Sequence, residues 1–287
     1  MREGREFAYT RRDFERVCAL IRQRAGIALA PGKEDMVYGR LARRLRHHGL
    51  QSFADYLDLL ANAGEEEWTA FTNALTTNLT SFFREAHHFK VLKEHLQQCG
   101  DRRVLLWCAA SSTGEEPYSM AMTLCEHFGS LRPNAAILAT DIDTNVLDVG
   151  ARGVYPIERL EKMSDERKRK FFRRGRGAQE GYCKVIDELR SLITFRQLNL
   201  LDRHWGLRGP FDAIFCRNVM IYFDKPTQYQ ILQKMLPLLT QDGLFFAGHS
   251  ESFFHATDLI TSIGHTVYVR ARRKVEAAPG ERGALAA

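Results

Sequence analysis

The sequence lacks the features of a membrane-spanning, secreted or zinc-binding protein. No run of 18 or more apolar residues occurs in the 287 residues, so we expect no transmembrane helix. The N-terminus, residues 1–6, is charged and has no apolar segment, so we expect no signal peptide. The six cysteines form no C-x-x-C pair, and we expect a reduced, cytoplasmic protein without a metal site.

The chain also lacks both common glycine-rich phosphate-binding motifs. It contains no G-x-G-x-x-G and no Gly-Lys followed by Ser or Thr, which excludes a dinucleotide fingerprint and a P-loop. Residues 104–119 nevertheless have the pattern that opens a nucleotide-binding sheet, with an apolar strand, a tight polar turn and a helix start. A second apolar strand follows and ends in Asp141 and Asp143, where such sheets often bind ribose hydroxyls.

The residues of the first turn indicate the kind of ligand. Gly114 is its only glycine, and Glu115 and Glu116 follow at the predicted helix N-terminus. Two carboxylates there would repel a pyrophosphate, whereas they suit a cationic nucleoside that carries hydroxyls and an amine. S-adenosylmethionine has a sulfonium, an ammonium, a ribose and no phosphate, so it fits best. The alternative is that the acids only favour the helix dipole.

Polar residues follow several predicted strands at the same edge of the sheet. We favour Asp141 as a ligand residue and Asp143 as the cap of the next helix. Arg217 and Asn218 come directly after the apolar strand 211–216, so they should face the same crevice.

Four other residues also have a simple structural explanation. Asn199 has the donor and acceptor that an adenine edge requires, but it is also typical of an ordinary turn. Arg84 follows two phenylalanines and is able to bind a carboxylate, but a surface position beside a helix start explains it too. Tyr222 and Phe223 are candidates for simple core packing.

Positive charge is concentrated near the N-terminus. Residues 1–50 hold 12 Lys and Arg against 6 Asp and Glu, which equals the net charge of +6 of the whole chain. A stripe of cations recurs there at helical spacing: Arg40, Arg43, Arg44 and His47. Such a stripe is usually a solvated face, but the local excess also indicates an acidic partner, either nucleic acid or an acidic protein surface.

Changes in residue pattern divide the chain. Residues 8–76 have helical spacing of apolar side chains and should form a small helical domain. Residues 77–90 begin with the Asn and Thr that favour turns, and should form a linker that contributes to the active site. Residues 91–271 alternate apolar strands with helices, as in a parallel sheet with crossover helices. We expect the tail, residues 272–287, to be disordered.

The expected elements follow from the periodicity of each segment. Helices are predicted at 11–24, 35–48, 53–61, 66–75, 116–128, 144–151 and 228–239, with another that starts at Glu85. Strands are predicted at 104–110, 136–141, 211–216, 243–248 and 267–270. Residues 155–195 break the alternation, and we expect an inserted antiparallel hairpin subdomain with a helix at 163–172 and strands at 182–186 and 192–195.

Four segments in sequence order resemble one family. They are residues 73–85 (NALTTNLTSFFRE), 110–119 (ASSTGEEPYS), 139–143 (ATDID) and 211–224 (FDAIFCRNVMIYFD). Together they are similar to the CheR chemotaxis receptor methyltransferases, over about residues 10 to 270. The resemblance implies an α/β fold: a Rossmann-like S-adenosylmethionine-dependent methyltransferase domain with an inserted small antiparallel β subdomain and an N-terminal all-helical domain.

The resemblance also implies an activity and a set of site residues. Similar enzymes transfer a methyl group from S-adenosylmethionine to glutamate side chains of bacterial chemoreceptors, giving glutamyl methyl esters and S-adenosylhomocysteine. It implies a cytoplasmic enzyme at chemoreceptor arrays, and we expect a monomer without nucleic acid or membrane insertion. Carried onto matching positions, the cofactor-binding residues would be Asn78, Thr80, Arg84, Glu116, Asp141, Asn199, Leu200, Arg217 and Asn218. This choice selects Glu116 over Glu115.

Two receptor-binding regions are implied by the same resemblance. The basic helix would contact the receptor's methylation helices through Arg40, Arg43, Arg44 and Arg46. In some members the β subdomain binds a pentapeptide at the receptor's C-terminus, and a longer, glycine-bearing loop marks them. This chain has such a loop, although Ala178 stands where proline is common. We expect the peptide to add as a strand to the hairpin edge, near Arg173, Arg174, Gly175, Arg176, Gly177 and Gly181.

The implied reaction makes few chemical demands. A glutamate is already ionised at cytoplasmic pH, so its methylation needs no general base. We predict Arg84 and Tyr222 as the catalytic residues, which orient the acceptor carboxylate. Two alternatives stay open: a nucleic-acid methyltransferase that grips phosphates with the basic domain, and an inactive module that tethers receptors. The small basic excess, without interleaved aromatic residues, is against the first.

Overall fold

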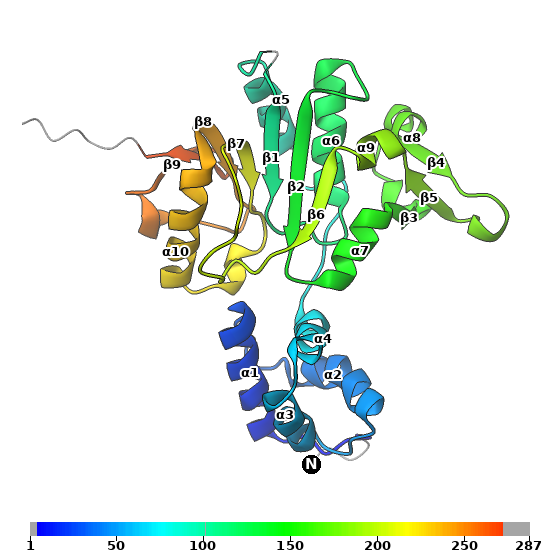
Figure 1. The fold of residues 1–287 in the computed structure, drawn as a ribbon, viewed down its shortest axis with the longest axis vertical. Helices are drawn as coiled ribbons and strands as arrows, with labels where there is room; N and C mark the ends of the chain where they lie inside the picture. Colours follow the sequence, from blue (N-terminus) through cyan, green and yellow to red (C-terminus); the bar gives the residue numbers. More distant parts are fainter. Residues whose placement is uncertain (1–4, 101, 272–287) are drawn as a thin grey trace, which may run out of the picture.

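The computed structural model of the protein describes residues 5–100 and 102–271. A connector joins a helical domain to a larger α/β domain, which Figure 1 shows with the helical domain below the sheet. The predicted disordered tail, residues 272–287, lies outside the described residues. None of the helices in the described part combines the length and the apolar character needed to cross a membrane.

Four helices form the N-terminal domain, each within one residue of its predicted bounds. They are α1 (Arg11–Ala25), α2 (Glu34–His48), α3 (Phe53–Ala61) and α4 (Glu65–Leu75). Thr10 begins α1 with a capping box, in which its hydroxyl accepts the Asp13 amide and the Asp13 carboxylate accepts the Thr10 amide. Each helix buries an apolar stripe in one shared core, which confirms the helical domain.

The connector, residues 76–86, is irregular and ends in a tight turn. Phe83 and Glu85 have φ angles of 52° and 56°, a region that residues with a side chain rarely adopt. Because Glu85 is not helical, α5 (His87–Leu96) begins two residues later than predicted.

Seven strands form the main sheet, in the order β6-β2-β1-β7-β8-β10-β9. Their bounds are β1 (Val104–Cys108), β2 (Ala135–Asp141), β6 (Ile193–Gln197), β7 (Phe211–Phe215), β8 (Leu239–Phe246), β9 (Ile260–Gly264) and β10 (Val267–Arg270). The strands from β6 to β8 are parallel, as predicted, whereas β10 and β9 are antiparallel. Strand β9 has no sequence prediction, because only its first residue is buried and its apolar pattern is weak.

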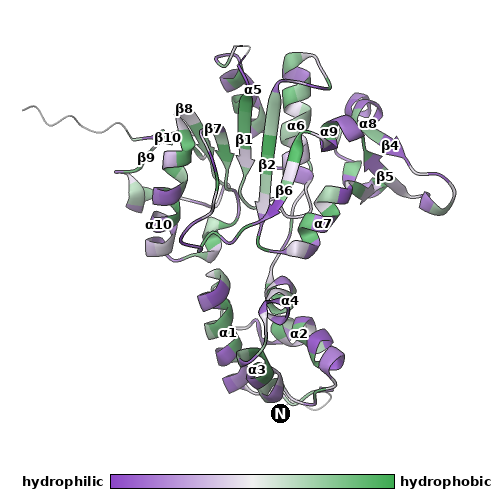
Figure 2. Cartoon of the chain, viewed as in Figure 1, coloured by the Kyte–Doolittle hydropathy of each residue, from purple (hydrophilic) through white to green (hydrophobic). Residues whose placement is uncertain are grey.

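Helices cover both faces of this sheet, whose central strands are its most hydrophobic part (Figure 2). On β1, Leu106 and Cys108 pack in one core with α5 and α6 (Glu115–Phe128), whereas Trp107 packs with α10 (Lys225–Met235) on the other face. Helix α7 (Thr144–Arg152) lies beside β6 and β2. Helix α10 ends before the predicted Leu239, because Pro237 opens a 3-10 turn at Leu236–Leu238. Short 3-10 helices follow β7 at Met220–Tyr222 and β8 at Phe254–Ala256.

A small three-stranded antiparallel sheet, in the order β3-β5-β4, confirms the inserted subdomain. Its elements are β3 (Val154–Pro156), a 3-10 helix (Ile157–Leu160), α8 (Asp165–Phe171), β4 (Phe172–Arg174), a 3-10 turn (Gly177–Gln179), β5 (Tyr182–Val185) and α9 (Asp187–Arg190). The assignment of residues 192–195 to this insert is wrong. Residues 193–195 belong to β6, which pairs in parallel with β2, because Ile193 packs in the core of the main sheet.

Candidate active site

A cavity of about 460 Å³ lies at the carboxyl ends of the parallel strands. The connector and the helical domain close its other side, and its volume is in the usual range for small-molecule sites. The residues predicted to bind the cofactor, together with Tyr222, all line this cavity: Asn78, Thr80, Arg84, Glu116, Asp141, Asn199, Leu200, Arg217 and Asn218.

The turn after β1 places the backbone close to its neighbours. Gly114 has a φ of 97°, and a Cβ there would lie 2.8 Å from both the Cα of Gly150 and the hydroxyl of Tyr155. The glycine is therefore required for packing against α7 and β3. Two residues earlier, the amide of Ser112 donates to Oδ2 of Asp141 at 2.8 Å, which joins this turn to the end of β2.

Asp141 and Asp143 lie in different surroundings. Asp141 is buried at the cavity wall, and burial raises its pKa to about 6, although the amides of Asp143 and Ser112 donate to its carboxylate. The side chain of Asp143 accepts the amide of Asn145 and so caps α7, which confirms it as a structural residue.

The side chains of the two glutamates at the start of α6 lie in different surroundings. Glu116 lines the cavity and accepts a hydrogen bond from Nη1 of Arg217 at 2.8 Å. Glu115 accepts the hydroxyl of Thr113 at 2.6 Å, lies 3.6 Å from Arg159, and is not among the lining residues. Burial raises the pKa of Glu116, although the charge of Arg217 opposes this rise.

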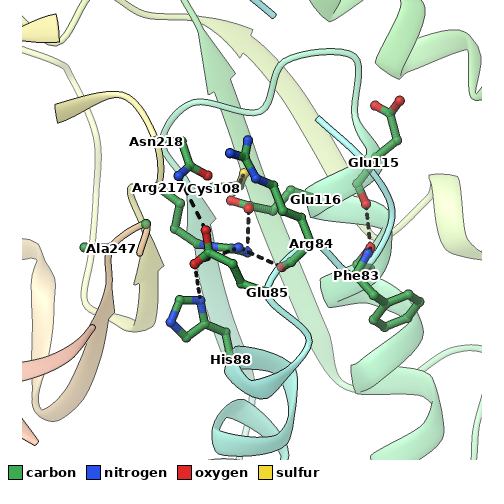
Figure 3. A network of polar contacts seen from close by, with 12 residues as sticks. Phe83, Arg84, Glu85, His88, Cys108, Glu115, Glu116, Arg217, Asn218 and Ala247 are labelled. Atoms are coloured by element: carbon green, nitrogen blue, oxygen red, sulfur yellow. Dashed lines mark hydrogen bonds and ion pairs between the residues drawn. The ribbon is translucent and has the colours of Figure 1, made fainter. Parts of the chain in front are cut away.

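Arg217 is fully buried at the centre of a polar network (Figure 3). Its Nη2 donates to the carbonyl oxygen of Arg84 at 2.7 Å, in addition to the contact of Nη1 with Glu116. The next residue, Asn218, has a φ of 57°, and its amide donates to the carboxylate of Glu251 at 3.0 Å. The connector and the end of β7 are thus held together beside the cavity.

Arg84 and Tyr222 line the cavity from two segments, the connector and the 3-10 helix after β7. The guanidinium of Arg84 donates to the carbonyl oxygen of Leu79 at 3.0 Å and lies partly exposed at the wall. The hydroxyl of Tyr222 has no hydrogen-bond partner among residues 5–100 and 102–271, and this side chain is half-buried. Both groups are therefore placed where they can meet an incoming side chain.

Asparagine side chains in the wall also hold the protein together. The amide nitrogen of Asn78 donates to Asp143 at 2.8 Å. That of Asn199 donates to the carbonyl oxygen of Arg24 at 2.8 Å, and its oxygen accepts the amide of Leu201 at 3.0 Å. Asn199 thus forms a turn and joins the two domains, while its side chain also borders the cavity.

The arginines of α2 do not form one free stripe. Arg40 donates to the carbonyl oxygen of Leu75 at 3.1 Å, and Arg44 pairs with Glu67. Arg46 is exposed but pairs with Glu6. Arg43 is exposed and has no partner within the described ranges. An acidic surface would therefore meet Arg43 without the loss of an internal contact.

The candidate peptide-binding hairpin has an accessible edge. Strand β4 is at the edge of the small sheet and carries Arg173 and Arg174, both exposed. A shallow hollow of about 630 Å³ is lined there by Arg173, Arg174, Gly175, Arg176, Gly177 and Glu180. A Cβ on Gly175 would lie 2.0 Å from the carbonyl oxygen of Gln179, so the loop requires glycine at this position.

Sequence patterns miss the contribution of the helical domain to the cavity. Ile27, Leu29 and Met36 line it, and the amide of Ala28 donates to the carbonyl oxygen of Tyr222 at 3.2 Å. The only available signal is an apolar run outside a helical pattern, residues 27–30.

Two family models and several known proteins are similar in sequence to this chain. A family model described as "CheR methyltransferase, SAM binding domain" matches residues 78–269, and one described as "CheR methyltransferase, all-alpha domain" matches residues 12–76. The chain is 54% identical to chemotaxis protein methyltransferase 2 of Pseudomonas aeruginosa, across 92% of this chain and 95% of that protein. It is 51% identical to the chemotaxis protein methyltransferase of Salmonella typhimurium, across 91% of each chain.

Both family models thus match in consecutive order, with the boundary between them at the connector. The resemblance inferred from the four sequence segments is confirmed, as is a fold with an all-helical domain and a Rossmann-like methyltransferase domain. The chain belongs to the CheR methyltransferase family.

Proposed function

We propose that this chain transfers a methyl group from S-adenosylmethionine to glutamate side chains of bacterial chemoreceptors, giving glutamyl methyl esters and S-adenosylhomocysteine. The observation that carries the proposal is the cavity, which is lined by Glu116 and Asp141 at the sheet end and also by Arg84 and Tyr222. The names of the similar proteins from Pseudomonas aeruginosa and Salmonella typhimurium, chemotaxis protein methyltransferases, support the choice of acceptor.

The chemistry of the cavity wall fits S-adenosylmethionine. Asp141 has a buried carboxylate that can accept ribose hydroxyls, and Glu116 can accept the ammonium group. Arg84 can pair with the methionine carboxylate, while Ile142, Leu198 and Leu200 supply apolar surface for the base. Asn78, Thr80, Asn199, Arg217 and Asn218 complete the proposed cofactor-binding set.

The protein's part in the reaction is positioning. When bound, S-adenosylmethionine supplies an electrophilic methyl group, and an ionised glutamate accepts it without prior deprotonation. Arg84 and the free hydroxyl of Tyr222 would hold the acceptor oxygen in line with that methyl group. The apolar wall excludes water, and correct alignment can be worth up to about 7–11 kcal/mol of the barrier.

Two surfaces would recruit the receptor. Arg43, supported by Arg40, Arg44 and Arg46 on the same helix, would meet an acidic face of the methylation helices. The edge of β4 would bind a C-terminal receptor peptide by strand addition, with the nearby arginines on its carboxylates. We propose a cytoplasmic monomer that is recruited in this way to chemoreceptor arrays.

The peptide surface has a direct test. We expect Arg174→Ala to weaken the binding of a receptor tail peptide measured by calorimetry, because it removes a cation at the edge strand. Arg132→Ala removes an exposed arginine elsewhere and should leave the affinity unchanged. No binding to the unaltered protein at peptide concentrations of about 10–100 μM would exclude the peptide site.

The activity itself is tested with receptor-containing membranes and S-adenosylmethionine labelled in its methyl group. We expect the label to enter receptor protein and to be released as methanol by mild base, as an ester requires. Label that enters RNA, or no label in any product, would refute the proposal in favour of a nucleic-acid methyltransferase or a tethering module.

A further inference from the structure

The loop after β8 places a buried carboxylate, that of Glu251, against the segment that follows β7. Its Oε2 accepts the amides of Asn218 at 3.0 Å and Gly248 at 2.5 Å, and its Oε1 accepts the amide of Met220 at 2.7 Å. Glu251 is 5% exposed, and burial raises its pKa although these hydrogen bonds oppose the rise. A buried carboxylate is costly unless it is hydrogen-bonded, so the three amides account for its place here.

The segment that Glu251 contacts carries part of the proposed active site. Asn218 and Tyr222 both line the cavity, and Met220–Tyr222 form the 3-10 helix after β7. The first amides of a helix have no acceptor within that helix, and Glu251 supplies one for Met220. Asn218 has a φ of 57°, a conformation that persists only where its surroundings enforce it and that is frequent at active sites.

A second contact from the same loop fixes the side chain of Asn218. A Cβ on Gly248 would lie 2.1 Å from Nδ2 and 2.8 Å from Cγ of Asn218, so the backbone of the loop lies directly against this side chain. The amide of Gly248 donates to the same oxygen of Glu251 that accepts the Asn218 amide. One loop thus holds both the backbone and the side chain of Asn218.

Other groups hold the segment through its carbonyl oxygens. Nε2 of Gln228 donates to the carbonyl oxygen of Met220 at 2.8 Å. The amide of Ala28, in the helical domain, donates to the carbonyl oxygen of Tyr222 at 3.2 Å. Glu251 has the complementary part, because it binds amides at the start of the segment, and it is not among the residues that line the cavity. Any effect of Glu251 on the reaction must therefore pass through this segment.

We propose that Glu251 is a positioning residue for methyl transfer, whose carboxylate fixes residues 218–222 so that Asn218 and Tyr222 present their side chains to the cavity. The inference rests on the proposed function, since it requires that Tyr222 orients the methyl acceptor. Glu251 itself touches neither the cofactor nor the acceptor.

The test is a double-mutant cycle on kcat with Glu251→Gln and Tyr222→Phe, measured as methyl transfer to receptor-containing membranes below the unfolding temperature of every variant. Glutamine has the shape of glutamate, but its amide nitrogen cannot accept a hydrogen bond, so at least one amide contact is lost. We expect Glu251→Gln to lower kcat by about tenfold or more, because a misplaced group at a reacting centre can cost about a hundredfold. In Tyr222→Phe, which lacks the phenol to be positioned, the same change should lower kcat by less than about threefold.

A matched control lies at the opposite end of β7. Asp212 is also a buried carboxylate, 1% exposed, and it accepts the amide of Leu105 at 2.8 Å, but it does not line the cavity. Asp212→Asn should lower the melting temperature and leave kcat within about twofold, because it contacts no part of the segment 218–222.

The outcomes separate positioning from stability. If Glu251→Gln leaves kcat unchanged, or lowers it by the same factor with and without the Tyr222 phenol, Glu251 has only a structural role and the inference is wrong. If Glu251→Gln does not fold, Gly248→Ala replaces it in the cycle, because the added Cβ displaces Asn218 while the carboxylate stays. Absence of methyl transfer by the unaltered protein would overturn the proposed function, and the inference with it.

Discussion

The carboxylate of Asp143 accepts a hydrogen bond from the side-chain amide of Asn78 at 2.8 Å. The same oxygen accepts the hydroxyl of Thr76 at 2.6 Å, and the other accepts the amide of Asn145 at the start of α7. One buried side chain thus fixes the connector to the end of β2, beside Asp141. The shape of the cavity wall therefore depends on a residue that caps a helix.

Asp143→Ala should lower both stability and cofactor affinity. Loss of the cap and of the contacts to the connector should reduce the free energy of unfolding by about 1–3 kcal/mol, measured by urea denaturation. S-adenosylmethionine should bind more weakly, because Asn78 loses its partner. Ser52→Ala removes the cap of α3 alone and should lower stability without a change in affinity. Unchanged affinity in Asp143→Ala would show that the connector holds its shape without this contact.

The variants Glu116→Gln and Glu115→Gln should differ in their affinity for the cofactor, because only Glu116 lines the cavity. We expect Glu116→Gln to weaken S-adenosylmethionine binding by about 10–100-fold, the value of one charge-assisted hydrogen bond. Glu115→Gln loses the charge that faces Arg159, so it should lower the melting temperature while affinity stays within about twofold. Equal effects of the two variants on affinity, measured by calorimetry, would contradict the assignment.

Cofactor affinity should depend on pH through Asp141, whose pKa is about 6. Ribose hydroxyls donate to the ionised carboxylate, so affinity should be constant above about pH 7 and about tenfold lower at pH 5. The Asp141→Asn variant should bind S-adenosylmethionine weakly, and its affinity should no longer change with pH through the titration of residue 141. Any pH dependence that is left in this variant can come from Glu116, whose pKa is also raised. A profile identical to that of the unaltered protein would remove Asp141 from the binding step.

The Asp141 carboxyl should make the folded protein less stable as pH rises, whereas it makes cofactor binding stronger. Its pKa is higher in the folded protein than the usual value of about 3.9 in an unfolded chain, so the folded state binds the proton more tightly. Its contribution to the free energy of unfolding should therefore decrease as pH rises from about 4 to 6. Urea denaturation across this range, compared with Asp141→Asn, measures that contribution.

Tyr222→Phe should lower turnover more than cofactor affinity. The phenol is free of hydrogen bonds within the described residues, so its removal leaves no buried group unpaired and should not disturb the fold. We expect kcat to fall by about tenfold or more, with the dissociation constant of S-adenosylmethionine nearly unchanged, because the hydroxyl would contact only the acceptor. Single-turnover methyl transfer measures this, and an unchanged kcat would remove Tyr222 from the mechanism.

Substitution of Arg43 should affect receptor binding, whereas substitution of its neighbour on α2, Arg44, should affect stability. Arg43→Ala should raise the KM for receptor several-fold and leave stability within about 0.5 kcal/mol, because Arg43 has no internal partner. Arg44→Ala should cost about 1–2 kcal/mol of unfolding free energy, because Glu67 loses its guanidinium. A KM that responds to neither variant would place the receptor contact elsewhere.

The sequence by itself determined the class of fold and of ligand. Apolar periodicity predicts α1 to α4 within one residue, because each helix buries one stripe in a local core. The single glycine at Gly114 and the acids after it exclude a phosphate-binding turn, since charge and backbone approach are local properties. Six of the predicted cofactor-binding residues line the cavity because they end or follow parallel strands: Glu116, Asp141, Asn199, Leu200, Arg217 and Asn218. The other three, Asn78, Thr80 and Arg84, reach it from the connector.

Only the tertiary structure decided which groups are free to act. Residues 193–195 join the main sheet because they pair with β2, where Ile193 lies opposite Ile137, 56 residues earlier in the sequence, and periodicity carries no information about partners. The amide of Asn199 is bound to Arg24, the guanidinium of Arg44 to Glu67, and Arg217 to two acids from separate elements. Whether a polar residue is available to a ligand depends on neighbours that are distant in sequence, and folding alone brings them together.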